Sequence, residues 1–515
     1  MTVADHARGG DRPALGGGNL AVSLLLGAWF FLVFPTEPLY FENQNTKFLH
    51  GMALAGIGHL DQDWTAGTID VMPVFTGIVY ILHMAAPPAI AYLVQIALFA
   101  IFLYSVLRLA DAAAGKGAAH TIFPVIIGVL VVASQFSNGG ARVWGGVAKQ
   151  YLLGPALEPQ SFGVLFLLAI VWFLRQRVEA ALWLAAVPAI IHPGYVVPAG
   201  ALILGFVTSA WLSPDIARRP RLWVVVGSLT VASASMIYLG LMILPTDVES
   251  WQRANEILAT IRIPRHAVPA YWFDFDASAK LVGLLFVFWI VRRQSRALFW
   301  ILAVGFGVAL SLTLLAVLMD SNELGMISPW RISVYLVPLG LAVLLGRFVA
   351  WALRQFERGN ATKLYWPILW SLAALAVAVT ANGIRKTLQD YASIETPAHV
   401  AFMRDTGDDQ TLYLTHPFDM SIRLESRLPQ LVSWKTHPYK DVEVLEWYER
   451  FRLASRIFKG QSVTCAALDE AVSLYGVTHL LLEDRALPTD CGRGEIVFES
   501  EEALIYRLHH DTTDP

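Results

Sequence analysis

Acidic side chains gather in a polar stretch that follows the first apolar run of the chain. Glu42 lies a few residues beyond that run, and Asp61 and Asp63 follow further along the stretch. Apolar surroundings at a water–lipid boundary raise the pKa of a carboxyl group, which suits Glu42 to general-base work on a hydroxyl. Asp61 or Asp63 could contact an acceptor, and Glu42 with Asp63 could hold a divalent metal ion. The alternative is a surface loop whose aspartates cap a short helix.

Basic and imidazole side chains recur in the later polar stretches, beside aromatic residues. Such a mixture suits a lipid phosphate, although it also forms ordinary interfacial belts. Arg331 opens an apolar segment, where its guanidinium could grip a phosphate at two points or reach out to the interface. The candidate ligands of a lipid phosphate or substrate are Arg142, Lys149, His192, Arg265, His266 and Arg331.

The composition divides the chain into an apolar body and a charged tail. Of 515 residues, 56% are hydrophobic and 15% charged, which excludes a disordered chain and an ordinary water-soluble enzyme. The net charge of −3 offers no basic face for nucleic acid. Residues 384–515 hold 36 charged side chains in 132 residues. We therefore expect a cytoplasmic N-terminal tail over 1–19, a transmembrane domain over 20–383, and a soluble domain over 384–515.

Apolar runs predict about 11 membrane-crossing helices, the first of them retained rather than cleaved as a signal peptide. Between 73 and 109 two runs separated by prolines are predicted to give only one crossing, the other being re-entrant or on the surface. Short arginine-rich turns mark the cytoplasmic side. They place a first outer loop at 36–72, a second at 245–278, and the tail outside.

The tail reads as a mixed α/β domain. Alternating or apolar runs predict strands at 411–415, 431–435, 477–482, 496–499 and 503–507, and amphipathic patterns predict helices at 441–459 and 468–475. The chain has only two cysteines, Cys465 and Cys491. An oxidising compartment outside the membrane would let them form a disulfide; two separate thiols are the alternative.

In outline the chain resembles the GT-C superfamily, polytopic glycosyltransferases that take sugars from polyprenyl-phosphate donors. The likeness is carried by Phe41-Glu42-Asn43 after the first helix, by the stretch from Ala55 to Trp64, by Pro73 opening the next helix, and by Trp330-Arg331 with Tyr335 and Pro338. It implies Glu42 as the base, Asp61 or Asp63 as acceptor or metal ligand, and Arg331 as the phosphate clamp. The family has an aspartate where this chain has Glu42, and no second acid adjoins it.

Three functions follow in order of preference. The first is an inverting transfer of a sugar from a polyprenyl phosphate to an acceptor on the outer face of a bacterial inner membrane. The second is an inactive scaffold whose tail binds a periplasmic protein, because a fold does not guarantee an activity. The third is a transporter, which would need paired polar groups at the membrane midplane or a repeat.

Overall fold

The computed structural model describes most of the chain as two compact units. Unit 1 is Met1–Glu37, Ala91–Ile237 and Ile263–Gln389, and unit 2 is Pro38–Ile90, Tyr238–Arg262 and Asp390–Pro515. The described residues are 17–34, 36–40, 43–85, 88–115, 122–135, 143–358, 362–392, 396–459, 463–483, 486–488, 491–492 and 494–509.

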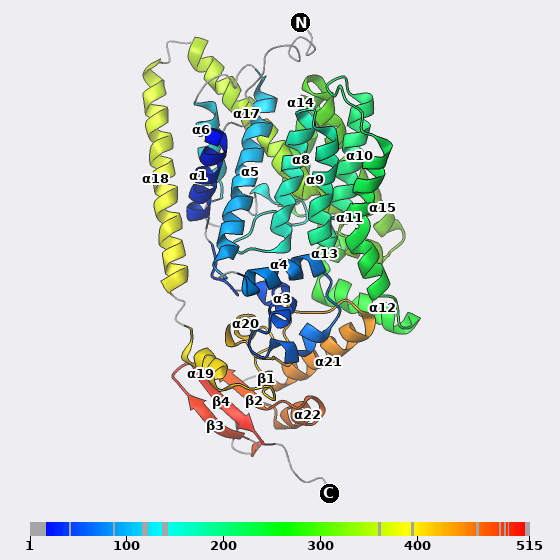
Figure 1. Cartoon of the computed structure of the whole chain (residues 1–515), viewed down its shortest axis with the longest axis vertical. Helices are drawn as coiled ribbons and strands as arrows, with labels where there is room; N and C mark the ends of the chain where they lie inside the picture. Colours follow the sequence, from blue (N-terminus) through cyan, green and yellow to red (C-terminus); the bar gives the residue numbers. More distant parts are fainter. Residues whose placement is uncertain are drawn as a thin grey trace. The chain divides into compact units, whose positions relative to one another are not determined.

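Unit 1 is built from long apolar helices joined by short turns (Figure 1). Its longer helices are α1 (Gly17–Val33), α5 (Ile90–Ala114), α6 (Phe123–Ala133), α8 (Val164–Leu174), α9 (Val178–Ile191), α10 (Val196–Leu212), α11 (Leu222–Met242), α14 (Phe275–Gln294), α15 (Arg296–Leu318), α17 (Ser333–Arg358) and α18 (Thr362–Ala392). Short helices join them: η6 (Pro159–Gly163), η7 (Pro193–Tyr195), α13 (Pro264–Ala267), η9 (Pro269–Tyr271), α16 (Asn322–Met326) and η10 (Pro329–Ile332).

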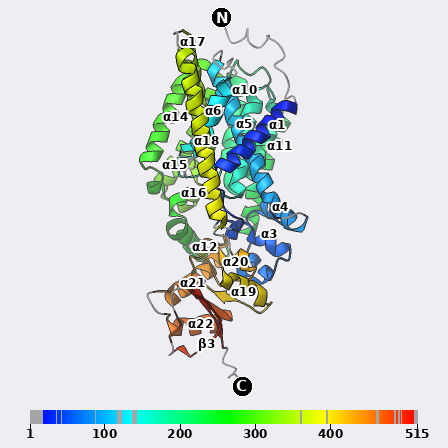
Figure 2. The same cartoon turned by 90° about the vertical axis from the view of Figure 1, so that its left-hand side faces the viewer.

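Small and aromatic side chains pack these helices closely. The rings of Phe173 in α8 and Phe206 in α10 stack with centroids 4.4 Å apart. A Cβ at Gly205 would lie 3.2 Å from the backbone of Ile301, so glycine lets α10 approach α15. Outward-facing side chains are also apolar, and Trp366 and Trp370 are 63% and 70% exposed on α18, a long straight helix in both views (Figures 1 and 2). A helix that is apolar on all sides is typical of a membrane span.

Six of the described helical segments are long and apolar enough to cross a membrane: Ile90–Ala114, Pro193–Leu212, Leu222–Met242, Arg296–Leu318, Asn322–Phe356 and Trp366–Gln389. Five shorter apolar helices accompany them, among them α4 (Pro73–Met84). At 1.5 Å per residue, α4 is about 18 Å long, too short for a hydrocarbon core of about 30 Å. Of the pair between 73 and 109, α5 is the helix that is long and apolar enough to cross a membrane; that the pair makes a single crossing stays a prediction. The count of eleven crossings stays a prediction.

The arginine-rich turns of unit 1 meet at one end of its helices. The Arg221 guanidinium donates two hydrogen bonds of 2.6 Å to the carboxylate of Glu179, joining the turn before α11 to the start of α9. Oδ2 of Asp215 accepts from the backbone N–H of Ala297 at 3.1 Å, which ties the same turn to α15. The hairpin connectivity consequently brings residues 158–163, 192–195, 264–274 and 319–331 to the opposite helix ends.

Unit 2 combines the first loop, part of the second loop and the tail. Its loop elements are α2 (Gln44–Lys47), α3 (Leu49–Leu54), η2 (Leu60–Gln62), η3 (Trp64–Gly67), α4, α12 (Val248–Glu256) and η8 (Ile257–Arg262). The tail adds α19 (Ala398–Thr406), β1 (Tyr413–Leu414), α20 (Ile422–Ser426), α21 (Asp441–Ile457), α22 (Cys465–Tyr475), β2 (His479–Glu483), β3 (Gly494–Glu499) and β4 (Ala503–Leu508). The sequence boundary at 384 falls near the tail's start at Asp390, whereas the loops fold with the tail.

The tail sheet has the strand order β1-β2-β4-β3. β1 runs parallel to β2, and β4 is antiparallel to both β2 and β3. The strand predicted at 431–435 is wrong: Gln430 makes a single bridge to Tyr413, residues 431–435 form no strand, and Thr436 then contacts Thr46 of the first loop. The short helices α19 and α20 are not among the elements predicted from the sequence. A disulfide joins Cys465 to Cys491.

The chain is thus a polytopic, mainly α-helical membrane protein with a small α/β domain at its C-terminal end.

Candidate functional site

Arg331 is presented by a sharp turn at the start of α17. Ser328 adopts a left-handed conformation with φ of 53°, and Pro329 then opens η10. The backbone N–H of Arg331 donates to the carbonyl of Ser328 at 2.8 Å, which closes the turn. The turn therefore fixes the backbone of Arg331 immediately before a long membrane helix, and its guanidinium is half-buried.

Gln150 holds the guanidinium from a different part of unit 1. Oγ of Ser333 accepts the backbone N–H of Val147 at 2.7 Å, which ties the segment before Gln150 to the start of α17. The buried Gln150 then accepts a 2.7 Å hydrogen bond from Nε of Arg331 through Oε1. Its amide Nε2 lies 3.4 Å from Nδ1 of His266. Because the amide nitrogen is a donor, His266 carries its own proton on Nε2.

His192 faces the same guanidinium from the turn between α9 and α10. Nδ1 of His192 accepts the backbone N–H of Gly194 at 3.3 Å, so its proton lies on Nε2. That Nε2 is 3.5 Å from Nη1 of Arg331. Both atoms carry N–H groups, so an anion beside them could accept a hydrogen bond from each.

Gly194 is required for the closeness of this arrangement. A Cβ at position 194 would overlap Nη1 of Arg331 and lie 3.1 Å from Cε1 of His192. Pro193 sets the preceding backbone and opens η7. The guanidinium consequently rests against a bare backbone between His192 and Tyr195, a position that any side chain at residue 194 would fill.

We call Gln150, His192, His266 and Arg331 the donor cluster. They come from four segments far apart in the sequence and lie at the helix ends opposite the arginine-rich turns. Arg331 is always charged, and the two imidazoles present N–H groups. Such a group of donors at the end of apolar helices suits the phosphate of a lipid.

The remaining predicted ligands lie near these segments with other partners. Nζ of the exposed Lys149 pairs with the carboxylate of Asp274 at 2.8 Å, and that hydrogen bond lowers the pKa of Asp274. Arg265 is exposed on α13, beside His266. Arg142 lies outside the described residues. The buried Glu158 and Arg331 both lie within electrostatic reach of Tyr195, so an acid borders this region as well.

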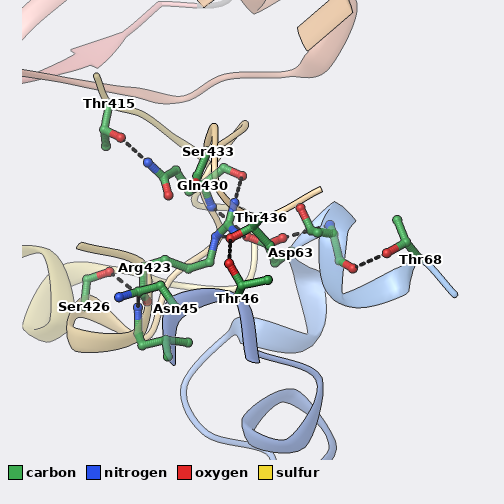
Figure 3. A network of polar contacts seen from close by, with 12 residues as sticks. Asn45, Thr46, Asp63, Thr68, Thr415, Arg423, Ser426, Gln430, Ser433 and Thr436 are labelled. Carbon is green, nitrogen blue, oxygen red and sulfur yellow. Dashed lines mark hydrogen bonds and ion pairs between the residues drawn. The ribbon is translucent and has the colours of Figure 1, made fainter. Parts of the chain in front are cut away.

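Asp63 is buried in a polar network of unit 2 instead of facing a cavity (Figure 3). Oδ1 accepts the backbone N–H of Thr65 at 2.8 Å and so caps η3, while Oδ2 accepts that of Gln430 at 3.0 Å. Oδ2 also lies 2.9 Å from Nε of Arg423 in an ion pair whose side chains are 0% and 1% exposed. The carboxylate thereby connects the first loop to the tail.

Other hydrogen bonds also join the first loop to the tail beside the pair of Asp63 and Arg423. Oγ1 of Thr46 lies 3.1 Å from Oγ1 of Thr436, and Oδ1 of Asn45 accepts the backbone N–H of Leu424 at 3.2 Å (Figure 3). Burial lowers the pKa of the Arg423 guanidinium, and the carboxylate of Asp63 opposes that effect. The catalytic or metal role of Asp63 stays a prediction, but these contacts favour a structural role.

Asp441 makes a second connection within unit 2. Its carboxylate accepts the backbone N–H of Thr246 at 2.6 Å and its Oγ1–H at 2.9 Å. Burial tends to raise the pKa of Asp441, yet the hydrogen bonds from Thr246, Lys440 and Val442 outweigh it and lower the pKa to about 2. The start of α21 is thus anchored to the segment before α12.

The other two predicted acids lie apart from this network. Asp61 is exposed on η2, where its Oδ2 accepts a 3.0 Å hydrogen bond from the neighbouring Gln62. Glu42 lies outside the described residues. Within the part of the chain that the structure describes, no group of three His, Cys, Asp or Glu side chains is arranged to hold a metal ion.

The structure therefore brings together three of the predicted ligands, Arg331, His192 and His266, and adds Gln150 and Gly194. Gln150 follows Lys149 directly, and that adjacency was its only signal in the sequence. Gly194 sits in a Pro-Gly turn, which indicates a break in the hairpin but not the approach of a distant guanidinium.

Part of the tail matches the model of a described domain family. The model of a domain of unknown function, DUF6798, matches residues 395–454. No curated protein matches the chain. Among solved structures, the crystal structure of ArnT from Cupriavidus metallidurans bound to undecaprenyl phosphate covers 98% of this chain and 100% of its own, at 13% identity and a TM-score of 0.44. A likeness at this level assigns no activity to this chain.

Proposed function

We propose that this protein is a GT-C-type membrane glycosyltransferase that moves a sugar from a polyprenyl-phosphate donor to an acceptor outside the membrane. The donor cluster carries the proposal. Gln150 orients the Arg331 guanidinium, and His192 directs a second N–H toward the same point. Such a cluster at the end of membrane helices fits a phosphate whose lipid tail lies in the bilayer.

The proposed chemistry is a single inverting displacement. A base removes the proton of an acceptor hydroxyl, the oxygen attacks the anomeric carbon, and the bond to the phosphate oxygen breaks. The polyprenyl phosphate then leaves with one more negative charge. Arg331 and the imidazole N–H groups stabilise that charge as it forms, which lowers the barrier. Glu42 stays the predicted base.

The test compares Arg331→Ala with Arg293→Ala. Arg293 lies in the last turn of α14, at the helix end where the arginine-rich turns are, so its removal leaves the donor cluster intact. Full-length protein in detergent is incubated with undecaprenyl phosphate or with undecaprenol, and retained lipid is measured by native mass spectrometry. We expect phosphate-dependent retention that weakens about tenfold to a hundredfold in Arg331→Ala, as for a charged hydrogen bond, and persists in the control. Equal retention of both lipids by the unaltered protein contradicts the phosphate site.

Transfer itself is measured with labelled undecaprenyl-phosphate sugars and membrane lipid extracts as acceptors. Glu42→Gln and Arg331→Ala should both reduce it. Undiminished transfer in both variants contradicts the site assignment. The scaffold alternative is favoured by the burial of Asp63 among structural partners. Lipid retention without transfer from any donor, together with capture of a periplasmic protein by the tail, would support that alternative.

A further inference from the structure

Three arginine-rich turns of unit 1 join into one surface at the helix ends opposite the donor cluster. They lie between α8 and α9, between α10 and α11, and between α14 and α15. The amide of Gln176 donates to the carbonyl of Asp215 at 2.8 Å and accepts the backbone N–H of Ala217 at 2.9 Å. Oδ2 of Asp215 accepts a 3.2 Å hydrogen bond from the hydroxyl of Ser295. We call residues 175–179, 213–221 and 292–296 the arginine surface.

The arginine surface has a large excess of positive charge. Its eight arginines are all exposed: Arg175, Arg177, Arg218, Arg219, Arg221, Arg292, Arg293 and Arg296. The same residues include only two carboxylates, those of Glu179 and Asp215. Glu179 pairs with Arg221, while Asp215 accepts hydrogen bonds from the turn before α15. Eight guanidinium groups against two carboxylates leave six positive charges, which attract anions from outside the chain.

Tryptophan rings border the arginine surface on three helices. In each of three pairs a guanidinium lies over a ring, 4.3, 4.9 and 5.9 Å from its centre: Arg219 over Trp211, Arg221 over Trp223, and Arg293 over Trp289. All three rings are more than half exposed. Tryptophan at the depth of the lipid headgroups, with a cation reaching past it toward water, is typical of a membrane interface.

Apolar side chains extend the border along the helices. Leu212 at the end of α10, with Leu222 and Val226 at the start of α11, is more than half exposed, as are the other two. A water-soluble anion would leave this apolar border in contact with water. A lipid would cover it with acyl chains while its headgroup met the guanidinium groups, so the combination of charge and apolar surface favours a lipid.

We propose that the arginine surface binds an anionic phospholipid. Arginines of at least two turns hold its phosphate, and its acyl chains lie against the exposed apolar side chains of α10 and α11. Charge complementarity selects an anionic headgroup over a zwitterionic one. The inference goes beyond the proposed transfer reaction, since the arginine surface and the donor cluster share no residue.

Native mass spectrometry of the full-length protein in detergent tests the inference. The probes are dioleoyl phosphatidylglycerol and dioleoyl phosphatidylcholine, which have the same acyl chains and differ in net charge. We expect phosphatidylglycerol to be retained about tenfold more strongly. Combining Arg218→Gln with Arg292→Gln should weaken its retention about tenfold to thirtyfold, at roughly fivefold for each arginine. The matched control, Arg253→Gln with Arg452→Gln, removes two exposed guanidinium groups from unit 2 and should leave retention unchanged.

Arg331→Ala separates this site from the phosphate site of the proposed function. That variant should lose undecaprenyl phosphate retention and keep the preference for phosphatidylglycerol, whereas the double variant of Arg218 and Arg292 should do the reverse. Loss of the phosphatidylglycerol preference in Arg331→Ala would place the lipid at the donor cluster and contradict the inference.

Three further results would overturn the proposal. They are equal retention of the two lipids by the unaltered protein, an unchanged preference in the double variant, and displacement of phosphatidylglycerol by an equal concentration of glycerol 3-phosphate, which would indicate a site for a free phosphate. Raising ammonium acetate from about 0.05 M to about 0.5 M should weaken the preference, because salt screens exposed charges. A preference that does not change with salt contradicts the inference without depending on the folding of any variant.

Discussion

At the scale of single residues, the buried pair of Asp63 and Arg423 sets the largest expected energetic effect. Both side chains are fully enclosed, so removing one charge leaves the other without compensation. The adjacent Asp61 has the same chemistry but is exposed. The two aspartates therefore form a matched comparison within one loop.

Asp63→Asn should destabilise unit 2 by about 3–5 kcal/mol, the usual result of breaking a buried ion pair. Asp61→Asn should change stability by less than about 0.5 kcal/mol. Thermal unfolding in detergent, followed by far-UV circular dichroism, measures both. Adding Arg423→Met to Asp63→Asn should recover part of the loss. If Asp63→Asn abolishes transfer without moving the unfolding midpoint, the catalytic prediction for Asp63 stands.

Asp441 gives a pH-dependent expectation. Its pKa falls from 3.8 to about 2 on folding, so its contribution is complete above pH 4 and is lost as the pH falls through 2. Asp441→Asn should therefore lower the unfolding midpoint at pH 7, and its difference from the unaltered protein should shrink between pH 4 and pH 2. Asp405→Asn, at a 73% exposed side chain, is the control. A constant difference across this range contradicts the assigned role.

At the scale of elements, the turn between α9 and α10 positions Arg331 through the absence of a side chain. Gly194→Ala places a methyl group where Nη1 of Arg331 now lies. The guanidinium is the end of a flexible side chain and can move, so stability should change little while the donor cluster is disturbed.

We expect Gly194→Ala to weaken undecaprenyl phosphate retention about tenfold, toward the level of Arg331→Ala, as for loss of a charged hydrogen bond. The unfolding midpoint should stay close to that of the unaltered protein. Gly200→Ala, in the same hairpin, has nothing within 4 Å of the added Cβ and serves as the control. Full lipid retention by Gly194→Ala would show that the position of Arg331 against residue 194 is not required.

At the scale of the whole molecule, the two units differ in composition. Unit 1 exposes large apolar side chains to its surroundings, as expected in lipid. Unit 2 carries the charged tail together with the loops that follow α1 and α11. The positive-inside rule predicts that the arginine-rich turns of unit 1 lie on the cytoplasmic side of the membrane.

Cysteine labelling tests this orientation. Ala217→Cys places a thiol at an exposed position in an arginine-rich turn, and Glu501→Cys places one at an exposed position of the tail. The native cysteines are joined in a disulfide and should not react. A membrane-impermeant maleimide should label Glu501→Cys in intact cells, and Ala217→Cys only after permeabilisation. The reverse pattern contradicts the predicted orientation.

Much of the fold followed from local patterns. Apolar runs locate the long helices, and alternation locates β2, β3 and β4, because each pattern reports on one element at a time. The segment 431–435 has a strand-like pattern, yet its backbone bonds to the second loop: the guanidinium of Arg262 donates to the carbonyl of Lys435 at 2.9 Å. A distant contact of this kind overrides local propensity.

The sequence by itself determined a membrane protein with a charged α/β tail, because hydropathy and charge are properties of short stretches. It also singled out Arg331, His192 and His266 as residues able to bind an anion. Only the tertiary structure decided that Arg331 contacts both Gln150 and His192, that Gln150 also contacts His266, and that Asp63 turns toward Arg423. Such pairings join positions 181 and 139 residues apart, and packing of the whole chain selects them, so no spacing in the sequence encodes them.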